Sequence, residues 1–162
     1  MEAVGLAVEA LAMHHERTEI VTRERTQFVD LTPWVRACVQ RSRIDRGIVL
    51  VRALHTTATI VVNENEPLLL EDLRQMLERL APENGTYAHD DFARRGEAIE
   101  PDERRNGHSH ARAVLLGSAG PVGVTEGVLD LGRWQSLLLA ELDGPRRRSI
   151  SVMVLGTRRD RA

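Results

Sequence analysis

Short runs of β-branched residues recur along the chain, and only two segments break them with a helical pattern. Residues 48–54, 57–63 and 148–156 are rich in valine and isoleucine and predict strands. Leucines at positions 69, 70, 73, 77 and 80 share one side of a helix, so residues 67–82 predict a helix that begins at Pro67. The order of strands, helix, strands, helix and strands predicts an α+β fold with mostly antiparallel sheets and two main helices.

The first predicted helix spans residues 31–44. Thr32 stands at the N-cap position and Pro33 just inside the helix, in the order that a helix start favours. Upstream of it, residues 17–30 alternate enough to form one or two strands. Downstream, residues 45–47 contain Gly47 and predict a turn into the next strand.

A run of strands is predicted in the last third of the chain. Segments 111–117, 122–127 and 134–142 are apolar and are separated by Gly-Pro and Glu-Gly turn signals. Trp134 opens the last of these three strands and is predicted to lie in the core. Residues 83–111 are polar instead, and a long irregular segment inside a compact domain is usually functional or disordered.

Size and charge exclude several classes of protein. A chain of 162 residues is long enough to bury one hydrophobic core, so a single domain is expected. The formal net charge of −2 gives no argument for nucleic acid or an anionic membrane as partner. The sequence contains no lysine, which excludes a Schiff-base lysine and a Walker-type phosphate loop.

The chain also lacks the usual signs of export or membrane insertion. Cys38 is the only cysteine, so no internal disulfide forms, and it is predicted to be a small packed hydrophobe. No apolar run approaches the ~18 residues of a membrane span. The first residues show no basic leader followed by an apolar block. Cytoplasm is therefore the expected location.

Histidines are the strongest sign of chemistry. His14 and His15 fall in a weakly patterned stretch where a surface role is expected, and the other four lie beside polar clusters: His55, His89, His108 and His110. Three converging imidazoles with one open position would suit zinc or a similar divalent ion. The spacing matches neither a zinc finger nor an HExxH motif. The alternative is a set of solvated loop histidines with one partly buried strand histidine that donates to a carbonyl.

Two acidic residues near the end of a predicted strand have two interpretations. Glu64 and Glu66 would point the same way if the strand continued, and could then bind magnesium or serve as acid or base. Alternatively, Glu66 begins the following helix, with Asn63 or Asn65 as its cap. We favour the helix start for Glu66 and leave the role of Glu64 open.

Arginines follow a Gly-Pro turn at positions 146, 147 and 148. Guanidinium groups bind phosphate oxygens well, so this run is a candidate anion site. A solvated basic surface is the simpler interpretation of the same run.

Four stretches of the chain resemble the YjbQ family, an uncharacterised protein family also called secondary thiamine-phosphate synthase. They are GIVLVRALHTTATIVVNENEP, YAHDD, NGHSHARAVLLG and GVLDLGRWQSLLLAELDGPRRRSISVMVLG. The resemblance covers about residues 17–157, and the HTTA and ELDGPR blocks occur in the family's order.

This resemblance implies a compact α+β subunit that assembles as a homotrimer, with a metal or anion site near the subunit interface. By motif, the metal ligands would be His55, His89 and His110. Asn106, Arg146 and Arg148 would bind substrate or phosphate. His55 and Glu64 would act in catalysis. His108 stands where the family more often has a small residue and is treated as a bystander, and Arg133 stands where threonine is usual.

The resemblance also bears on the start of the chain. Family members begin shortly before a TEIVT-like strand, which here corresponds to a start near Met13. We therefore expect residues 1–12 to be an N-terminal extension that need not be ordered, and residues 13–162 to form the single YjbQ-like domain.

These residues are compatible with three functions. The first is a thiamine-phosphate synthase-like transferase, which needs a divalent cation on a diphosphate and cationic donors on its leaving oxygens. The second is a metal-dependent hydrolase or lyase acting on a small phosphorylated or anionic metabolite. The third is a trimeric protein that binds a metal or anion without turnover. Diphosphate chemistry usually recruits magnesium, whereas three histidines prefer zinc or a similar metal.

One distance limits how His55 and Glu64 could cooperate. A fully extended segment of nine steps at ~3.3 Å each separates them by roughly 30 Å, which is too far for one metal. Either a bend folds the segment back, or the two residues serve separate sites, or they meet across a subunit interface.

Overall fold

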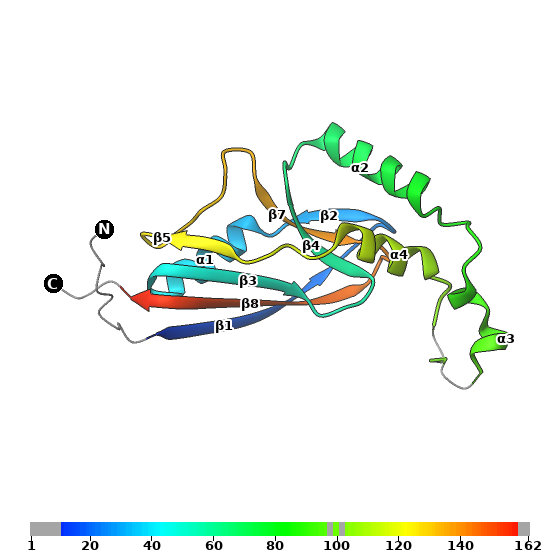
Figure 1. Cartoon of the computed structure of the whole chain (residues 1–162), viewed down its shortest axis with the longest axis horizontal. Helices are drawn as coiled ribbons and strands as arrows, with labels where there is room; N and C mark the ends of the chain where they lie inside the picture. Colours follow the sequence, from blue (N-terminus) through cyan, green and yellow to red (C-terminus); the bar gives the residue numbers. More distant parts are fainter. Residues whose placement is uncertain (1–10, 97–98, 101–102, 159–162) are drawn as a thin grey trace, which may run out of the picture.

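A computed structural model describes residues 11–96, 99–100 and 103–158 of the chain, and its strands form two antiparallel sheets (Figure 1). The five-stranded sheet has the order β1-β8-β3-β5-β6, and the three-stranded sheet has the order β2-β7-β4. Every pairing in both sheets is antiparallel. The strands are β1 (Ala12–Val21), β2 (Gln27–Asp30), β3 (Ile44–Ala53), β4 (Ala58–Asn63), β5 (Val122–Thr125), β6 (Val128–Leu129), β7 (Ser136–Glu141) and β8 (Arg147–Arg158). The α+β prediction is confirmed.

Helices connect and cover these sheets. The three helices of ten or more residues in the described chain are α1 (Thr32–Ser42), α2 (Pro67–Leu80) and α4 (Gly107–Leu116). A 3-10 turn, η1 (Ala88–Asp90), and a short helix, α3 (Phe92–Arg95), lie between α2 and α4. No helix in these described ranges is long and apolar enough to cross a membrane.

The elements form layers around two apolar clusters. The larger cluster fills the space between the five-stranded sheet, helix α1 and one side of the three-stranded sheet, with Val35, Ile60, Leu139 and Val152 at its centre. The smaller cluster lies on the other side of the three-stranded sheet, where Leu138 meets Leu77 of α2 and residues of α4. The three-stranded sheet is therefore buried on both sides. This burial explains why β7 is an unbroken apolar run and not an alternating one.

Strands β3 and β8 approach each other unusually closely at a pair of glycines. Gly47 pairs with Gly156, and a Cβ atom on Gly47 would lie 2.1 Å from the backbone oxygen of Leu155. The turn predicted at residues 45–47 is wrong, because β3 already begins at Ile44. Arg43, with a φ of 57°, makes the reversal after α1, and a bulge between Ile44 and Arg46 adjusts the register.

Both long predicted helices exist, but their caps differ from the prediction. Glu66 caps α2 with its own carboxylate, which accepts the N–H groups of Leu68 and Leu69, so the asparagines upstream are not the cap. At α1, Thr32 is the first helical residue and not the N-cap. Its hydroxyl instead accepts the Leu137 N–H at 2.9 Å and joins the helix start to β7.

Helix α4 corrects the sequence analysis. In the described part of residues 83–106 the regular elements are the short η1 and α3, as expected, but residues 107–116 form one helix where an irregular segment and a strand were predicted. A short apolar run cannot be assigned to strand or helix by its period alone. The helix ends at Gly117, whose φ of 64° favours glycine.

Two predicted core residues behave differently. Cys38 is fully buried, as predicted, and burial together with a hydrogen bond to Glu16 raises the pKa of its thiol to about 11. Trp134 is 61% exposed and lies before β7, so its predicted place in the core is wrong. Its ring packs beneath the guanidinium of Arg133, 4.7 Å away.

The predicted N-terminal extension lies mostly outside the described residues, because residues 1–10 are not described. Within the described part, β1 begins at Ala12 and pairs with β8 along its whole length. His14 and His15 therefore belong to a strand, and their ring nitrogens meet Glu16 and Ser151 respectively.

Candidate functional site

Four elements deliver polar side chains to one cavity at the end of the five-stranded sheet opposite the start of β1. The contributing elements are the loop between β3 and β4, the first turns of α4, the turn between β7 and β8, and the start of β8 (Figure 1). The cavity, here called the His55 pocket, has a volume of about 360 Å³. Its walls are Leu54, His55, Thr56, Thr57, Asn106, His110, Asp143, Arg146 and Arg148.

The His55 ring is held by a backbone donor. The Ser149 N–H donates to His55 Nε2 at 2.8 Å. An amide nitrogen can only donate, so Nε2 carries no proton and the neutral ring bears its proton on Nδ1. Burial lowers the pKa of His55, and the positive charges of Arg148 and Arg146 lower it further, against an opposing effect of Glu141. His55, which lines the pocket, is therefore a neutral ring with a donor at Nδ1.

Arg148 is part of a buried ion pair. Its Nε donates to Glu141 Oε2 at 2.6 Å and its Nη2 donates to Glu141 Oε1. The same Nη2 reaches the hydroxyl of Thr57 at 3.0 Å, just before β4 begins. Glu141 is completely buried and also accepts the N–H of Asp143. This pair joins β7, β8 and the β3–β4 loop, and it neutralises most of the charge that Arg148 would offer to a phosphate.

Arg146 is the more accessible arginine of the pocket. Its side chain is 31% exposed, and its Nε and Nη2 contact Asp143 Oδ2 at 2.9 and 2.8 Å. Asp143 is fully buried and also receives the amide of Asn106 at 3.0 Å on Oδ2. Arg104 lies on the other side of this carboxylate, with Nη2 3.6 Å from Oδ1.

The sequence Asn-Gly at positions 106 and 107 explains how His89 reaches His110. Asp90 Oδ1 accepts the N–H groups of Asn106 and Gly107, at 3.0 and 2.9 Å, and so fastens η1 to the first turn of α4. A Cβ at Gly107 would lie 2.4 Å from Tyr87 Cβ, so only glycine allows this approach. The rings of His89 and His110 consequently meet, with centroids 4.6 Å apart.

His110 is a neutral imidazole in this arrangement. Burial lowers its pKa first, and the neighbouring His89 lowers it further, whereas Asp143 and Glu103 act in the opposite direction. Its ring nitrogens make no side-chain hydrogen bond within the described residues. His110 therefore keeps a lone pair for a ligand or for a proton.

Two of the three predicted metal ligands come together, and the third does not complete the set. His89 and His110 are in ring contact, but the His55 lone pair is already used by Ser149. A metal on His55 Nδ1 would require loss of its proton. Among the described residues, no group of three histidine, cysteine or acidic side chains is placed to hold a metal. The site of three histidines, His55, His89 and His110, stays a prediction.

Glu64 lies away from the pocket. It follows the last residue of β4, whereas His55 precedes the first, so the length of β4 separates them. Its N–H donates to the side chain of Asn63, and Glu64 is not among the pocket residues. The structure thus favours separate sites over a bend, and a meeting across a subunit interface stays a prediction.

His108, treated as a bystander, faces the interior. It is 1% exposed, and its Nε2 lies 3.0 Å from the Ser109 hydroxyl, which itself donates to the Leu142 carbonyl. Burial and then Arg112 lower the pKa of His108. Its position supports the packing of α4 and not the pocket.

Sequence reasoning missed three groups of this site. Asp143 was seen only as part of a turn signal, Glu141 as the end of an apolar strand, and the Ser149 amide not at all. The acidic residues in the ELDGPRRR stretch were the available signal. An acidic pair at the end of an otherwise apolar, buried strand indicates a partner for nearby arginines.

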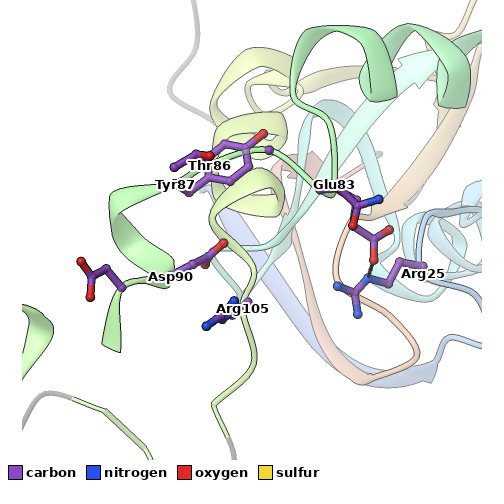
Figure 2. A pocket seen from close by; sticks show the side chains of 9 residues that line it. Arg25, Glu83, Thr86, Tyr87, Asp90 and Arg105 are labelled. Carbon is purple, nitrogen blue, oxygen red and sulfur yellow. Dashed lines mark ion pairs between the residues drawn. The ribbon is translucent and has the colours of Figure 1, made fainter. Parts of the chain in front are cut away.

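A second cavity of about 540 Å³ lies beside the N-terminal end of α4 (Figure 2). Arg25 and Glu83 lie side by side in its wall, and Arg25 Nε is 2.9 Å from Glu83 Oε1. Asp90 points toward the turn before α4, where its Oδ1 accepts hydrogen bonds from the backbone N–H groups of Asn106 and Gly107. Most charges of this cavity are thus satisfied by the protein itself, so the His55 pocket is the stronger candidate.

Comparison with known proteins gives a consistent set of relatives. The family model described as UPF0047 protein YjbQ-like matches residues 16–157. A UPF0047 protein of Methanothermobacter thermautotrophicus is 40% identical over 146 residues, covering 90% of this chain and 94% of that protein. UPF0047 protein YugU of Bacillus subtilis is 30% identical over 139 residues, covering 85% of this chain and 96% of that protein.

Solved structures agree with this pattern. A YbjQ-like protein from Sulfolobus solfataricus has a TM-score of 0.80 at 32% identity, covering 91% of this chain and 99% of that one. A YjbQ/UPF0047 family protein from Clostridium acetobutylicum has a TM-score of 0.74 at 32% identity, covering 86% and 98%. The Sulfolobus protein is described as being of unknown function, so the chemistry must be argued from the pocket itself.

Proposed function

The chain belongs to the YjbQ-like UPF0047 family, and from that premise we propose that it binds a small anionic metabolite in the His55 pocket and transfers a proton to or from it through His110. The observation that carries this proposal is the Ser149–His55 hydrogen bond, because it makes His55 a fixed neutral donor. A fixed donor beside an accessible arginine suits a phosphate or carboxylate oxygen.

The balance of charge around the pocket supports an anion. Two carboxylates at the pocket pair with three guanidinium groups, so positive charges exceed negative ones by one. The carboxylates are Asp143 and Glu141, and the guanidinium groups are those of Arg104, Arg146 and Arg148. Burial is the largest cause of the lowered pKa of His55, and the positive charges of Arg148 and Arg146 lower it further against Glu141. An anion at Arg146 would restore neutrality in a partly desolvated site.

Proton transfer is assigned to His110 because of its environment. A lowered pKa keeps the imidazole neutral near pH 7, so it accepts a proton from a bound water or substrate. General acid–base help of this kind contributes about 10²- to 10⁴-fold to a rate. Hydrolysis and elimination on a small phosphorylated metabolite both fit this role.

The thiamine-phosphate-forming transfer implied by the sequence resemblance places heavier demands on the pocket. A diphosphate leaving group needs a divalent cation and several free positive charges. Here Glu141 already pairs with Arg148, and Asp143 already pairs with Arg146. The pocket therefore favours a single phosphate or carboxylate group over a diphosphate.

A divalent metal forms a second proposal, carried by one observation. The contact between His89 and His110 could supply two ligands of a zinc site, and Glu103 lies 3.7 Å from His89 Nε2. Glu103 is engaged by Arg95, so a further ligand would have to come from a second subunit. The affinity for zinc, measured by titration, should then be lower in His89→Gln and unchanged in His55→Gln. Equal affinity in wild type and His89→Gln would refute the metal proposal.

The homotrimer is also kept as a proposal. On the open side of the five-stranded sheet, Leu155 of β8 lies between Met13 of β1 and Ile48 of β3 and pairs with both. Met13 is 62% exposed and Ile48 43% exposed, so an apolar strip is available to another subunit. Light scattering of wild type and Met13→Asp tests whether this strip joins subunits. The cytoplasmic location expected from the sequence is kept as a separate proposal.

Calorimetric titration with inorganic phosphate tests the main proposal. Arg146→Gln and His55→Gln should each weaken binding at least tenfold, because each removes one donor. Arg147→Gln is the matched control, since Arg147 is the next residue but is exposed and pairs with Glu19. If all four proteins bind phosphate equally, the His55 pocket is not the anion site. A turnover screen of phosphorylated metabolites with His110→Gln then tests the proton transfer.

A further inference from the structure

Two buried oxygen atoms in the wall of the His55 pocket have no hydrogen-bond donor among the described residues. They are Asn106 Oδ1 and Asp143 Oδ1. Asn106 is 7% exposed and Asp143 is fully buried, and both residues line the pocket. A buried acceptor without a donor lowers stability, and such atoms in a folded protein are usually satisfied by an ordered water or a ligand.

The orientation of the Asn106 amide is fixed by its neighbour. Its Nδ2 donates to Asp143 Oδ2 at 3.0 Å, so the amide oxygen is the atom left over. The same Oδ2 accepts Arg146 Nε at 2.9 Å, which leaves Oδ1 as the unused oxygen of Asp143. Arg104 Nη2 lies 3.6 Å from Oδ1, an ion pair that is too long for a hydrogen bond.

The pocket therefore presents donors and acceptors together. His55 Nδ1–H and Arg146 are the donors, and Asn106 Oδ1 and Asp143 Oδ1 are the acceptors. A fully deprotonated anion, such as a carboxylate, would satisfy only the donors. A ligand that satisfies both must carry an acidic group and, within a few bonds, a group that donates hydrogen bonds.

We infer that the ligand of the His55 pocket is an anion that carries a hydroxyl group on a neighbouring carbon, either a phosphate monoester or a hydroxy acid. This inference rests on the proposed anion site and adds the chemical class of its ligand. A hydroxyl is favoured over an ammonium group because guanidinium groups already outnumber carboxylates around the pocket. A further cation would be repelled by Arg104 and Arg146.

Matched ligands test the hydroxyl without changing the protein. In calorimetry, glycerol 3-phosphate should bind at least tenfold more tightly than propyl phosphate, and 2-aminopropyl phosphate should bind no better than propyl phosphate. Glycerate and propionate form a second pair, and comparison of the two pairs tells a phosphate monoester from a hydroxy acid.

Variants then assign the preference to the two acceptors. Asn106→Ala should remove most of the advantage that glycerol 3-phosphate has over propyl phosphate. Arg146→Gln should weaken every anion and keep the preference. Circular dichroism checks that Asn106→Ala is folded, and if it is not, the ligand pairs decide alone.

The outcomes separate the two proposals. Equal binding within both ligand pairs would overturn the inferred ligand class while leaving the anion site intact. Tighter binding of 2-aminopropyl phosphate than of glycerol 3-phosphate would overturn the choice of hydroxyl over ammonium. Binding of no phosphate or carboxylate, including inorganic phosphate, would overturn the anion site and the ligand class with it.

Discussion

The Nε2 atom of His55 lies 2.8 Å from the backbone nitrogen of Ser149 and accepts a hydrogen bond from it. This one contact fixes the loop between β3 and β4 against strand β8. It also uses the only lone pair that a neutral imidazole could give to a metal. His55 is consequently a donor to an anion, although its sequence neighbours are equally compatible with a metal ligand.

Lowering the pH below about 6.5 should destabilise the protein. Burial lowers the pKa values of His55, His108 and His110 in the folded state, whereas an unfolded histidine titrates near 6.5. Between the lowered values and 6.5 the unfolded chain binds more protons, so the free energy of unfolding falls as the pH falls. Above 6.5 both states are neutral at these rings, and their contribution is constant.

Thermal melts between pH 7.5 and 5 measure this effect. His108→Gln should show a smaller loss of melting temperature on acidification than wild type, because one buried ring no longer resists protonation. His15→Gln, at an exposed strand position, serves as the control and should follow the wild-type curve. A His108→Gln curve parallel to wild type would show that this buried ring is not responsible.

Breaking the buried pair of Arg148 and Glu141 should destabilise the fold strongly. Glu141→Gln leaves a buried guanidinium without its counter-ion, and such a change costs about 3–5 kcal/mol. The exposed pair of Arg147 and Glu19 offers a control, and Glu19→Gln should cost less than about 1 kcal/mol. Urea unfolding of both variants gives the two values, and similar losses would contradict the structural role assigned to Glu141.

Much of the fold could be predicted from the sequence. The runs that became β3, β4 and β8 were recognisable because strand-forming residues cluster there, and α2 was recognisable from its leucine spacing. Helix α4 was missed because its first turn, GHSH, is polar yet buried, and its second half is a short apolar run. Its burial depends on contacts with η1 and the three-stranded sheet, which a local pattern does not reveal.

The candidate site was only partly predictable. The resemblance indicated His55, His110, Asn106, Arg146 and Arg148, and all five line one pocket. It did not indicate which of them carry free donors, since that depends on their partners in the folded chain: Ser149 for His55, Glu141 for Arg148, and Asp143 for Arg146 and Asn106. Hydrogen-bond partners set the chemistry here, and they are a property of the folded chain.

Adding one methyl group at Gly107 should disturb the pocket. The new Cβ in Gly107→Ala would lie 2.4 Å from Tyr87 Cβ, so η1 must move away from α4 and carry His89 away from His110. Affinity for inorganic phosphate should fall at least tenfold, because Asn106 and His110 belong to the displaced turn. Gly120→Ala is the control, since its Cβ would meet nothing within 4 Å. Unchanged affinity in Gly107→Ala would show that this contact does not position the pocket.

Nitrogen-15 NMR of the histidine rings, recorded during titrations with phosphate and with zinc, tests the central claim most directly. The account predicts that His55 is neutral near pH 7, with its proton on Nδ1 and none on Nε2. Phosphate should shift the His55 Nδ1 signal, and zinc should leave that proton in place. A proton on His55 Nε2, or the loss of the Nδ1 proton when zinc binds, would contradict the assignment of His55 as an anion donor.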